Sequence, residues 1–312
     1  MNGLKLLATG RALPSQTLSN DDMSRYVETS DEWIGGRTGI RQRYFCAEGE
    51  NATTLAIEAS RLALERSGIP AAEIGCVVVA TSSGEYVMPS TASMVHGALA
   101  LDENIPTLDV GAACAGFLYA VEVARGLLLA GGRRYALVVG TEQMSSVLDM
   151  TDRTTCVLFG DGAGATVFEL DTEREYVSVQ GTRSDMAIRS GCPSITQKVP
   201  MQMDGQAVFR FAAAIIPKCV QDLFAKGGRT MDDVDWVVCH QANERILDAS
   251  IRRLGGKEKF YKNIDRYANT SAASIAIALD EMNEQGLLEE GQRIVMVGFG
   301  GGLTWAGIML CI

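Results

Sequence analysis

Short runs of valine, isoleucine and alanine alternate along this chain with longer stretches in which apolar residues recur at helical spacing. Four of the apolar runs, at residues 75–80, 135–140, 236–239 and 293–297, contain almost no polar side chains. Such runs are typical of strands covered on both faces, as in a sheet with helices on either side. The pattern therefore predicts an α/β fold.

The order of these segments is repeated in the two halves of the chain. The segment CVVVATSSG resembles DWVVCHQAN about 160 residues later, and the small-residue turns GAACAG and NTSAAS follow, each before an expected helix. The next strands end VGTE and VGFG. This duplication predicts a pseudo-twofold structure with two central sheets and shared buried helices. We expect tightly fused halves, residues 1–170 and 171–312, because no flexible linker separates them.

Composition narrows the class of protein. The chain has 312 residues, of which 47% are hydrophobic and 21% charged, as in ordinary globular proteins. A net charge of -10 argues against a broad nucleic-acid surface, although a local basic patch could still bind an acidic partner. No signal peptide or membrane-spanning segment is expected from the apolar pattern, which predicts a cytoplasmic protein.

The eight cysteines form no CxxC pairs and are too sparse for a disulfide scaffold, so they indicate reduced cytosolic thiols. They are residues 46, 76, 114, 156, 192, 219, 239 and 311.

Cys114 is the candidate nucleophile. It follows an expected strand at 107–110 and lies in the first turn of an expected helix, ACAGF. The positive end of the helix dipole should lower the pKa of this thiol and favour the thiolate. A buried structural cysteine is the alternative, because free cysteine packs as a small hydrophobe. The position of Cys114 does not by itself decide between the two.

His240 ends the strand at 236–239, at an edge where side chains project towards ligands. The other histidine, His96, lies in an apolar helical stretch and is interpreted as structural.

Asn269 begins the turn that corresponds, in the repeat, to the turn of Cys114. A plain helix N-cap is the alternative role for an asparagine there. Because the duplication brings Cys114, His240 and Asn269 to one face, they predict a site for thioester exchange followed by stabilisation of an enolate oxygen.

The sequence also contains two glycine-rich segments that could bind a ligand. GFGGG at 298–302 can approach a ligand closely and direct N–H groups at an oxyanion, or it can be a flexible hairpin turn. FGDGAG at 159–164 superficially suggests nucleotide binding, but we interpret it as a tight turn between strands.

At these residues the sequence resembles the β-ketoacyl-acyl-carrier-protein synthase III family of the thiolase superfamily, which starts type II fatty acid synthesis. The matching motifs span nearly the whole chain in the family's order: TSDEWI (29–34), RTGIR (37–41), ACAGF (113–117), FGDGA (159–163), HQAN (240–243), NTSAAS (269–274) and FGGGLTW (299–305). The resemblance implies the thiolase-like fold, with αβαβα layers.

The resemblance also implies an acyltransferase that joins a short acyl-CoA primer to malonyl-acyl carrier protein by decarboxylative Claisen condensation. Cys114 would carry the acyl group, while His240 and Asn269 would assist decarboxylation and hold the enolate oxygen. The backbone N–H groups of Cys114 and Gly301 would form the oxyanion hole, and Phe299 would line the malonyl side. No metal and no cofactor is expected, since coenzyme A enters as part of a substrate.

Further residues match the family's coenzyme A site. Trp33 and Arg37 would sandwich the adenine, with Thr29 and Arg153 close by, and Asn243 would touch the pantetheine arm.

The resemblance also implies an acidic carrier protein as a partner. The matching docking residues are Arg210, Gln241, Arg245, Arg252 and Arg253. A basic patch there could bind this partner despite the negative net charge. The alternative is that Arg252 and Arg253 are simply a solvated helix face.

The chain also departs from the family at several positions. Gly36 replaces a frequent threonine, Ala268 replaces a frequent glycine, and Glu244 interrupts the basic patch. Met88 matches the residue that crosses the family's dimer interface and ends the acyl pocket, so a homodimer is implied and primer length stays open.

Three alternative functions differ in which of these residues they need. A synthase-III-like enzyme of specialised metabolism would use the same three residues with another acyl donor or acceptor. A cysteine acyl hydrolase or simple acyltransferase would not need Asn269 beside His240. An inactive binding homologue would be expected to lose Cys114.

Overall fold

Two sheets form the centre of the molecule in the computed structural model, which describes residues 3–191 and 199–312. Cys192 lies outside the described residues. The first sheet has the order β1 (Gly3–Ala12), β7 (Gly162–Asp171), β6 (Tyr135–Glu142), β4 (Ile74–Ala80), β5 (Thr107–Val110). The second has the order β11 (Trp236–Cys239), β12 (Arg293–Gly300), β13 (Gly302–Cys311), β8 (Tyr176–Asp185). The four strands expected from the apolar runs are confirmed.

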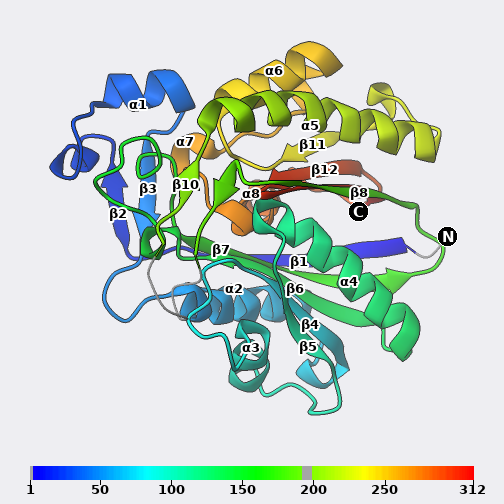
Figure 1. Ribbon diagram of the computed structural model, residues 1–312. Helices are drawn as coiled ribbons and strands as arrows, with labels where there is room; N and C mark the ends of the chain where they lie inside the picture. Colours follow the sequence, from blue (N-terminus) through cyan, green and yellow to red (C-terminus); the bar gives the residue numbers. More distant parts are fainter. Residues whose placement is uncertain (1–2, 192–198) are drawn as a thin grey trace.

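Helices alternate with these sheets in five layers (Figure 1). The central layer is α4 (Gly116–Gly131) and α8 (Ser274–Glu284), which pack between the sheets. The outer layers are α2 (Ala52–Ser67) with α3 (Thr91–Ala98), and α5 (Gly205–Gly227) with α6 (Glu244–Leu254). This is the expected αβαβα arrangement, and it explains the apolar runs, because strands such as β4 are buried along their whole length.

Smaller elements complete the described residues. β2 (Gln16–Ser19) pairs with β3 (Gln42–Phe45), and α1 (Asp31–Thr38) lies between them in the chain. The rest are β9 (Ile188–Arg189), β10 (Gln202–Met203), α7 (Ile264–Tyr267) and the 3-10 turns η1 (Asp22–Arg25), η2 (Ala71–Glu73), η3 (Ala113–Ala115), η4 (Met144–Ser146), η5 (Met231–Asp233), η6 (Lys257–Lys259) and η7 (Ser271–Ala273).

The pseudo-twofold repeat is visible in local detail. In each half a 3-10 turn precedes the central helix, η3 before α4 and η7 before α8. The first residues of the two turns share the left-handed backbone conformation, with φ of 48° at Ala113 and 49° at Ser271. Each turn packs on a strand of the other half: a Cβ on Gly140 would lie 2.3 Å from the Ala272 oxygen, and one on Gly298 would lie 3.2 Å from the Ala115 Cα. Interlocking turns of this kind make the halves one unit. The chain passes from the first sheet to the second between β7 and β8, near the expected boundary at residue 170.

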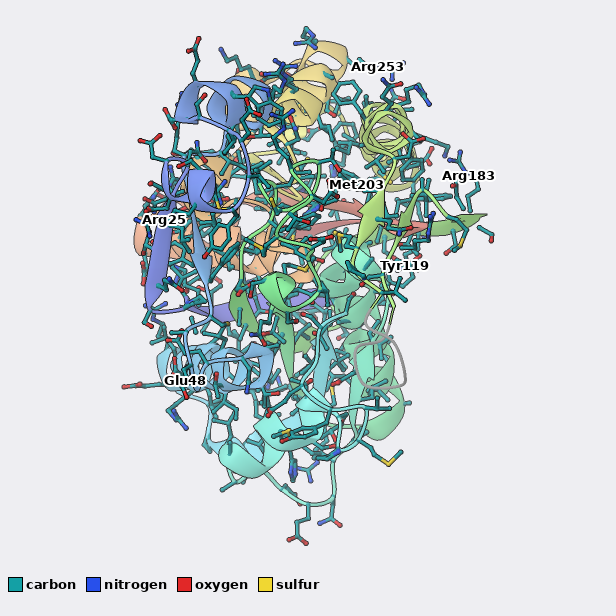
Figure 2. All side chains as sticks on the ribbon, turned by 60° about the vertical axis from the view of Figure 1, so that its left-hand side comes forward. Arg25, Glu48, Tyr119, Arg183, Met203 and Arg253 are labelled. Carbon is teal, nitrogen blue, oxygen red and sulfur yellow. The ribbon has the colours of Figure 1, made fainter. Side chains whose placement is uncertain are left out.

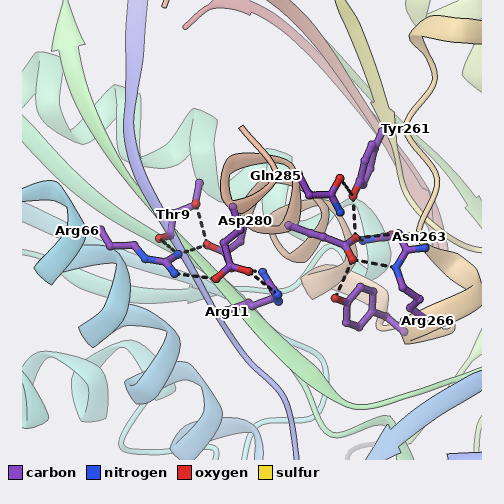
Figure 3. A network of polar contacts seen from close by, with 11 residues as sticks. Thr9, Arg11, Arg66, Tyr261, Asn263, Arg266, Asp280 and Gln285 are labelled. Atoms are coloured by element: carbon purple, nitrogen blue, oxygen red, sulfur yellow. Dashed lines mark hydrogen bonds and ion pairs between the residues drawn. The ribbon is translucent and has the colours of Figure 1, made fainter. Parts of the chain in front are cut away.

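Two adjacent carboxylates anchor α8 between the sheets (Figure 3). Asp280, fully buried, accepts hydrogen bonds from Thr9 and from the guanidinium groups of Arg11 and Arg66. Glu281 accepts bonds on the other side from Tyr261, Asn263, Arg266 and Tyr267. Removing one partner of such a buried group is costly, so these contacts hold the helix in one position.

The segment Ala113–Gly131 is long and apolar enough to cross a membrane by length and composition alone. Its packing between the two sheets accounts for that composition, since α4 belongs to the central hydrophobic cluster.

Candidate active site

A pocket of about 600 Å³ opens where the two halves meet, and its lining contains most of the expected catalytic residues. From the first half comes Cys114, and from the second half come His240, Asn269, Phe299 and Gly301. The expectation that the duplication brings these residues together is confirmed. Asn243 also lines this pocket, whereas Met88 does not.

Cys114 lies in η3, the turn that leads into α4, and it is only partly exposed to the pocket. Its Sγ donates a hydrogen bond to Ser271 Oγ over 3.3 Å. The expected lowering of its pKa is wrong for this structure. Burial raises the pKa of the thiol to about 12, although the bond to Ser271 lowers it. Removing the charged form from water outweighs the stabilisation at the helix end, so the resting group is a thiol.

His240 follows β11 directly, and its backbone N–H donates to the Val297 carbonyl of the neighbouring strand over 2.8 Å. Its ring is buried edge-on to Phe299, with 5.3 Å between ring centroids. Nδ1 lies 2.6 Å from Ser274 Oγ, the first residue of α8. Burial lowers the pKa of His240 to about 3, so the imidazole is neutral at physiological pH. His96, in contrast, bonds to the Asp102 carbonyl, which fits its structural interpretation.

Asn269 is held by the FGDGAG segment. Its N–H donates to the Leu158 carbonyl and its own carbonyl accepts from the Gly160 N–H, both over 3.0 Å. Its side-chain Oδ1 accepts from the Ser271 N–H over 2.9 Å, but the N-cap residue of η7 is Thr270, so Asn269 is not the expected N-cap. The bond through Oδ1 leaves the NH₂ group as the donor available to the pocket.

The FGDGAG segment is not the expected tight turn: Phe159 forms an isolated bridge with Asn269, residues 160–161 are irregular, and Gly162 begins β7. Asp161, within it, is buried and accepts bonds from the Ser145 N–H, the Ser145 hydroxyl and the Cys46 N–H. These bonds fix the segment, and with it Asn269.

The glycine-rich strand end is both a hairpin and a wall of the pocket. β12 ends at Gly300 and β13 begins at Gly302. A Cβ on Gly300 would lie 2.6 Å from the Cys114 nitrogen, whereas one on Gly301 would meet nothing closer than 3.4 Å. Only glycine allows this approach of strand to nucleophile at position 300.

The expected coenzyme A residues gather beside the pocket. Trp33, on α1, lies between two guanidinium groups, with Arg37 at 4.5 Å and Arg153 at 4.8 Å from the ring centroid. Asn243 connects this cluster to the pocket, because its Nδ2 donates to the Arg37 carbonyl. Thr29 Oγ1 is buried and has no hydrogen-bond partner in the part of the chain that the structure describes.

All four expected docking arginines are exposed, on two helices that pack against each other. Arg245, Arg252 and Arg253 are exposed on α6, and Arg210 is exposed on α5, which packs against it. Figure 2 shows Arg253 at the outer edge of the molecule.

Gln241 must be removed from this group. It is 1% exposed, its Nε2 donates to the Cys239 and Tyr261 carbonyls, and its Oε1 accepts from the Asn263 N–H. A side chain with all these bonds inside the protein supports the strand end and is not part of a docking surface.

Three buried polar residues beside the nucleophile were missed at the sequence level. Ser271, Ser274 and Glu142 are each 3% exposed or less, and they contact Cys114 or His240 directly or through one another. Their signal was their position, because all three lie in the repeated segments NTSAAS and VGTE.

Ala268 has an unusual backbone conformation, and Met88 is unusually exposed for an apolar residue. Ala268 has φ 56° and ψ -157°, a conformation that favours glycine, which agrees with the glycine that the family resemblance implies at this position. Met88 is 80% exposed and follows Tyr86 and Val87, which are 51% and 57% exposed.

Comparison with known proteins agrees with this geometry. Residues 108–184 match the family model for 3-oxoacyl-[acyl-carrier-protein] synthase III, and residues 224–312 match the model for its C-terminal part. The chain is 44% identical to the β-ketoacyl-[acyl-carrier-protein] synthase III of Rhizorhabdus wittichii, with 96% of each chain covered. It is 38% identical to that of Neisseria meningitidis, with 99% of each covered.

Solved structures place the fold in the same group. The 3-oxoacyl-[acyl-carrier-protein] synthase III of Aquifex aeolicus superposes with a TM-score of 0.93 at 35% identity, covering 99% of this chain and 100% of that one. The priming β-ketosynthase of the R1128 polyketide pathway superposes with a TM-score of 0.92 at 34% identity, covering 100% and 96%. The protein therefore belongs to the β-ketoacyl-acyl-carrier-protein synthase III family.

Proposed function

We propose that this protein condenses a short acyl-CoA primer with malonyl-acyl carrier protein and so initiates type II fatty acid synthesis. The observation that carries the proposal is the convergence of Cys114, His240 and Asn269 on one pocket from both halves of the fold. The thiol supplies a nucleophile, and the imidazole and carboxamide supply hydrogen-bond donors, which is the set that acyl transfer and enolate stabilisation need.

In the first step, Cys114 Sγ attacks the primer thioester and coenzyme A leaves. The acyl oxygen becomes negative in the tetrahedral intermediate and would accept from the N–H groups of Cys114 and Gly301, two residues that line the same pocket.

In the second step, the malonyl thioester loses CO₂ and its carbonyl oxygen takes the enolate charge. Nδ1 of His240 lies 2.6 Å from Ser274 Oγ, and we assign the tautomer in which Ser274 donates to Nδ1 and the ring proton is on Nε2. Nε2–H and the Asn269 NH₂ then donate to the enolate oxygen, while the enolate carbon attacks the acyl group on Cys114. A neutral histidine suits this role, because a donor is needed and no proton has to be released.

Coenzyme A would bind over α1. The adenine can stack on Trp33 once Arg37 or Arg153 moves aside from the ring, and the displaced guanidinium can then pair with a phosphate.

The carrier protein would dock on α5 and α6 through Arg210, Arg245, Arg252 and Arg253. In Arg252→Glu we expect KM for malonyl-carrier protein to rise and that for acyl-CoA to stay unchanged; Arg61→Glu, on α2 in the opposite outer layer, serves as the control. Equal effects of the two variants would argue against docking on α6.

We further propose a cytoplasmic homodimer in which the exposed segment Tyr86, Val87 and Met88 is covered by the second copy and Met88 limits the acyl pocket. No metal or resident cofactor takes part in this proposal.

The decisive experiment is a primer screen. The protein is incubated with straight and branched short acyl-CoAs, the mass of the Cys114 adduct is read, and malonyl-carrier protein is then added. We expect an adduct with at least one short primer and a 3-ketoacyl-carrier product, and neither in Cys114→Ala. An adduct without any condensation product would contradict initiation of fatty acid synthesis and favour an enzyme with another acceptor.

A further inference from the structure

The thiol of Cys114 is the first donor in a chain of hydrogen bonds that leads away from the pocket. Its Sγ donates to Ser271 Oγ over 3.3 Å, and Ser271 Oγ donates to Glu142 Oε1 over 3.0 Å. Both donors point the same way, from sulfur to carboxylate. No hydrogen bond joins Cys114 to His240 among the described residues, so the path available to the thiol proton runs through Ser271.

Glu142 is fully buried at the end of β6, beneath the η7 turn. Its Oε2 accepts from the Ser82 N–H over 3.0 Å and from the Ser83 hydroxyl. In residues 3–191 and 199–312 no lysine, arginine or histidine pairs with it. Within the described part of the chain, the titratable group linked to it is Cys114, through Ser271, while residues 81–83 present hydroxyl and N–H groups to it and Ala272 a backbone N–H.

We propose that Glu142, acting through Ser271, accepts the proton of the Cys114 thiol when the nucleophile is activated. The S–H bond breaks as its proton forms a bond to Ser271 Oγ, and the former Ser271 proton passes to Glu142 Oε1. Two protons move, a thiolate and a neutral carboxyl result, and the total charge of the site stays the same. The proton returns by the same route to the sulfur of the departing coenzyme A, which restores the carboxylate. Glu142 thus acts on Cys114 through Ser271 and does not touch the substrate, so it is a positioning residue. This assignment rests on the proposed function.

Burial supports this role. It raises the pKa of the Glu142 carboxyl, which makes the carboxylate a stronger base than an exposed one. Protonating His240 instead would create a buried cation whose pKa is lowered to about 3. Moving a charge from Glu142 to Cys114 is less costly than creating a new pair of charges in the same surroundings.

Proton transfer from Cys114 to Glu142 affects how the reactivity of Cys114 depends on pH. The thiol–carboxylate pair and the thiolate–carboxyl pair hold the same number of protons, so pH does not change their ratio. Reactivity of Cys114 should therefore be constant over a range of pH and fall on the acid side, where Glu142 becomes protonated. The reactivity of a cysteine without this acceptor instead rises about tenfold for each unit by which the pH increases, as long as the pH is below the pKa of the thiol.

The test measures alkylation of Cys114 by iodoacetamide in the folded protein from about pH 6 to pH 10, by mass spectrometry of the Cys114 peptide. We expect a plateau in the wild type. Glu142→Gln and Ser271→Ala should lose the plateau and react about 10²-fold more slowly near pH 7. Ser83→Ala should keep the plateau, but the rate should begin to fall at a higher pH than in the wild type, since the Glu142 carboxylate loses one hydrogen bond. Glu281→Gln, the same change at a buried carboxylate of α8, should keep the wild-type profile.

A rising wild-type profile without a plateau, or a plateau that survives in folded Glu142→Gln, would overturn the proposal. A uniform loss of rate with the profile unchanged would also overturn it, because that is the signature of a structural role. If Glu142→Gln does not fold, as judged by circular dichroism, the profile of Ser271→Ala decides. Alkylation needs no acyl substrate, so this result is independent of whether condensation occurs.

Discussion

Gly300 approaches Cys114 so closely that a Cβ on this glycine would lie 2.6 Å from the Cys114 backbone nitrogen. The contact joins the end of β12 in the second half to the η3 turn in the first half. The position of the nucleophile therefore depends on a strand nearly 200 residues away in the sequence.

We expect Gly300→Ala to displace η3 and to slow acylation of Cys114 by about 10²-fold, because small misplacements of reacting groups have effects of that size. Gly301→Ala, where a Cβ would meet nothing closer than 3.4 Å and the N–H is kept, should acylate within about threefold of wild type. Single-turnover acylation by acyl-CoA measures both. Equal rates in the two variants would contradict the steric argument.

Asn269 has two bonding functions that a substitution can separate. Asn269→Asp keeps the oxygen that accepts from the Ser271 N–H and removes the NH₂ donor. We expect acylation of Cys114 to stay within a few-fold and condensation to fall by about 10²–10³-fold, the usual effect of losing an oxyanion donor. Asn269→Ala should slow acylation as well, since the Ser271 N–H at the start of η7 loses its hydrogen-bond acceptor. Separate assays of the two half-reactions distinguish these outcomes.

His240 should make the folded protein sensitive to acid. Its folded-state pKa, about 3, lies below the ordinary value of 6.5, so between these values the unfolded chain binds a proton that the folded one does not. The free energy of unfolding should therefore fall as pH drops below 6.5, by at most about 1.4 kcal/mol per pH unit from this group. Urea denaturation of the wild type and of His240→Gln between about pH 6.5 and pH 4 tests this. Identical slopes would show that the folded protein accommodates a charged His240.

Trp33 should affect coenzyme A recognition without affecting the chemistry. Trp33→Ala removes the ring that Arg37 and Arg153 flank, so KM for acyl-CoA should rise by about tenfold. The rate with an acyl-pantetheine substrate that lacks adenine should not change. A loss with both substrates would mean that Trp33 supports the fold of α1 instead.

Much of the architecture was accessible from the sequence because it depends on local pattern. Buried strands such as β4 consist of small and β-branched residues, and the two small-residue turns occupy corresponding places in the two halves, so the duplication and the convergence of Cys114, His240 and Asn269 could be inferred from the order of the segments. Recognising the family motifs then assigned Cys114 to acyl transfer, and His240 together with Asn269 to decarboxylation.

Other features followed only from tertiary packing. Whether a side chain is buried depends on elements far away in the chain, and for that reason Gln241 was expected at the surface and the Cys114 pKa was expected to fall.

What the sequence by itself determined was the fold class, the repeat and the three residues at the centre of the site. The tertiary structure alone decided which groups those residues touch. Glu142 and Ser271 lie 129 residues apart, and their contact exists because β6 of one half packs beneath the η7 turn of the other. Hydrogen bonds and desolvation act over a few ångströms, so the protonation state of Cys114 is a property of the folded site and not of the sequence around it.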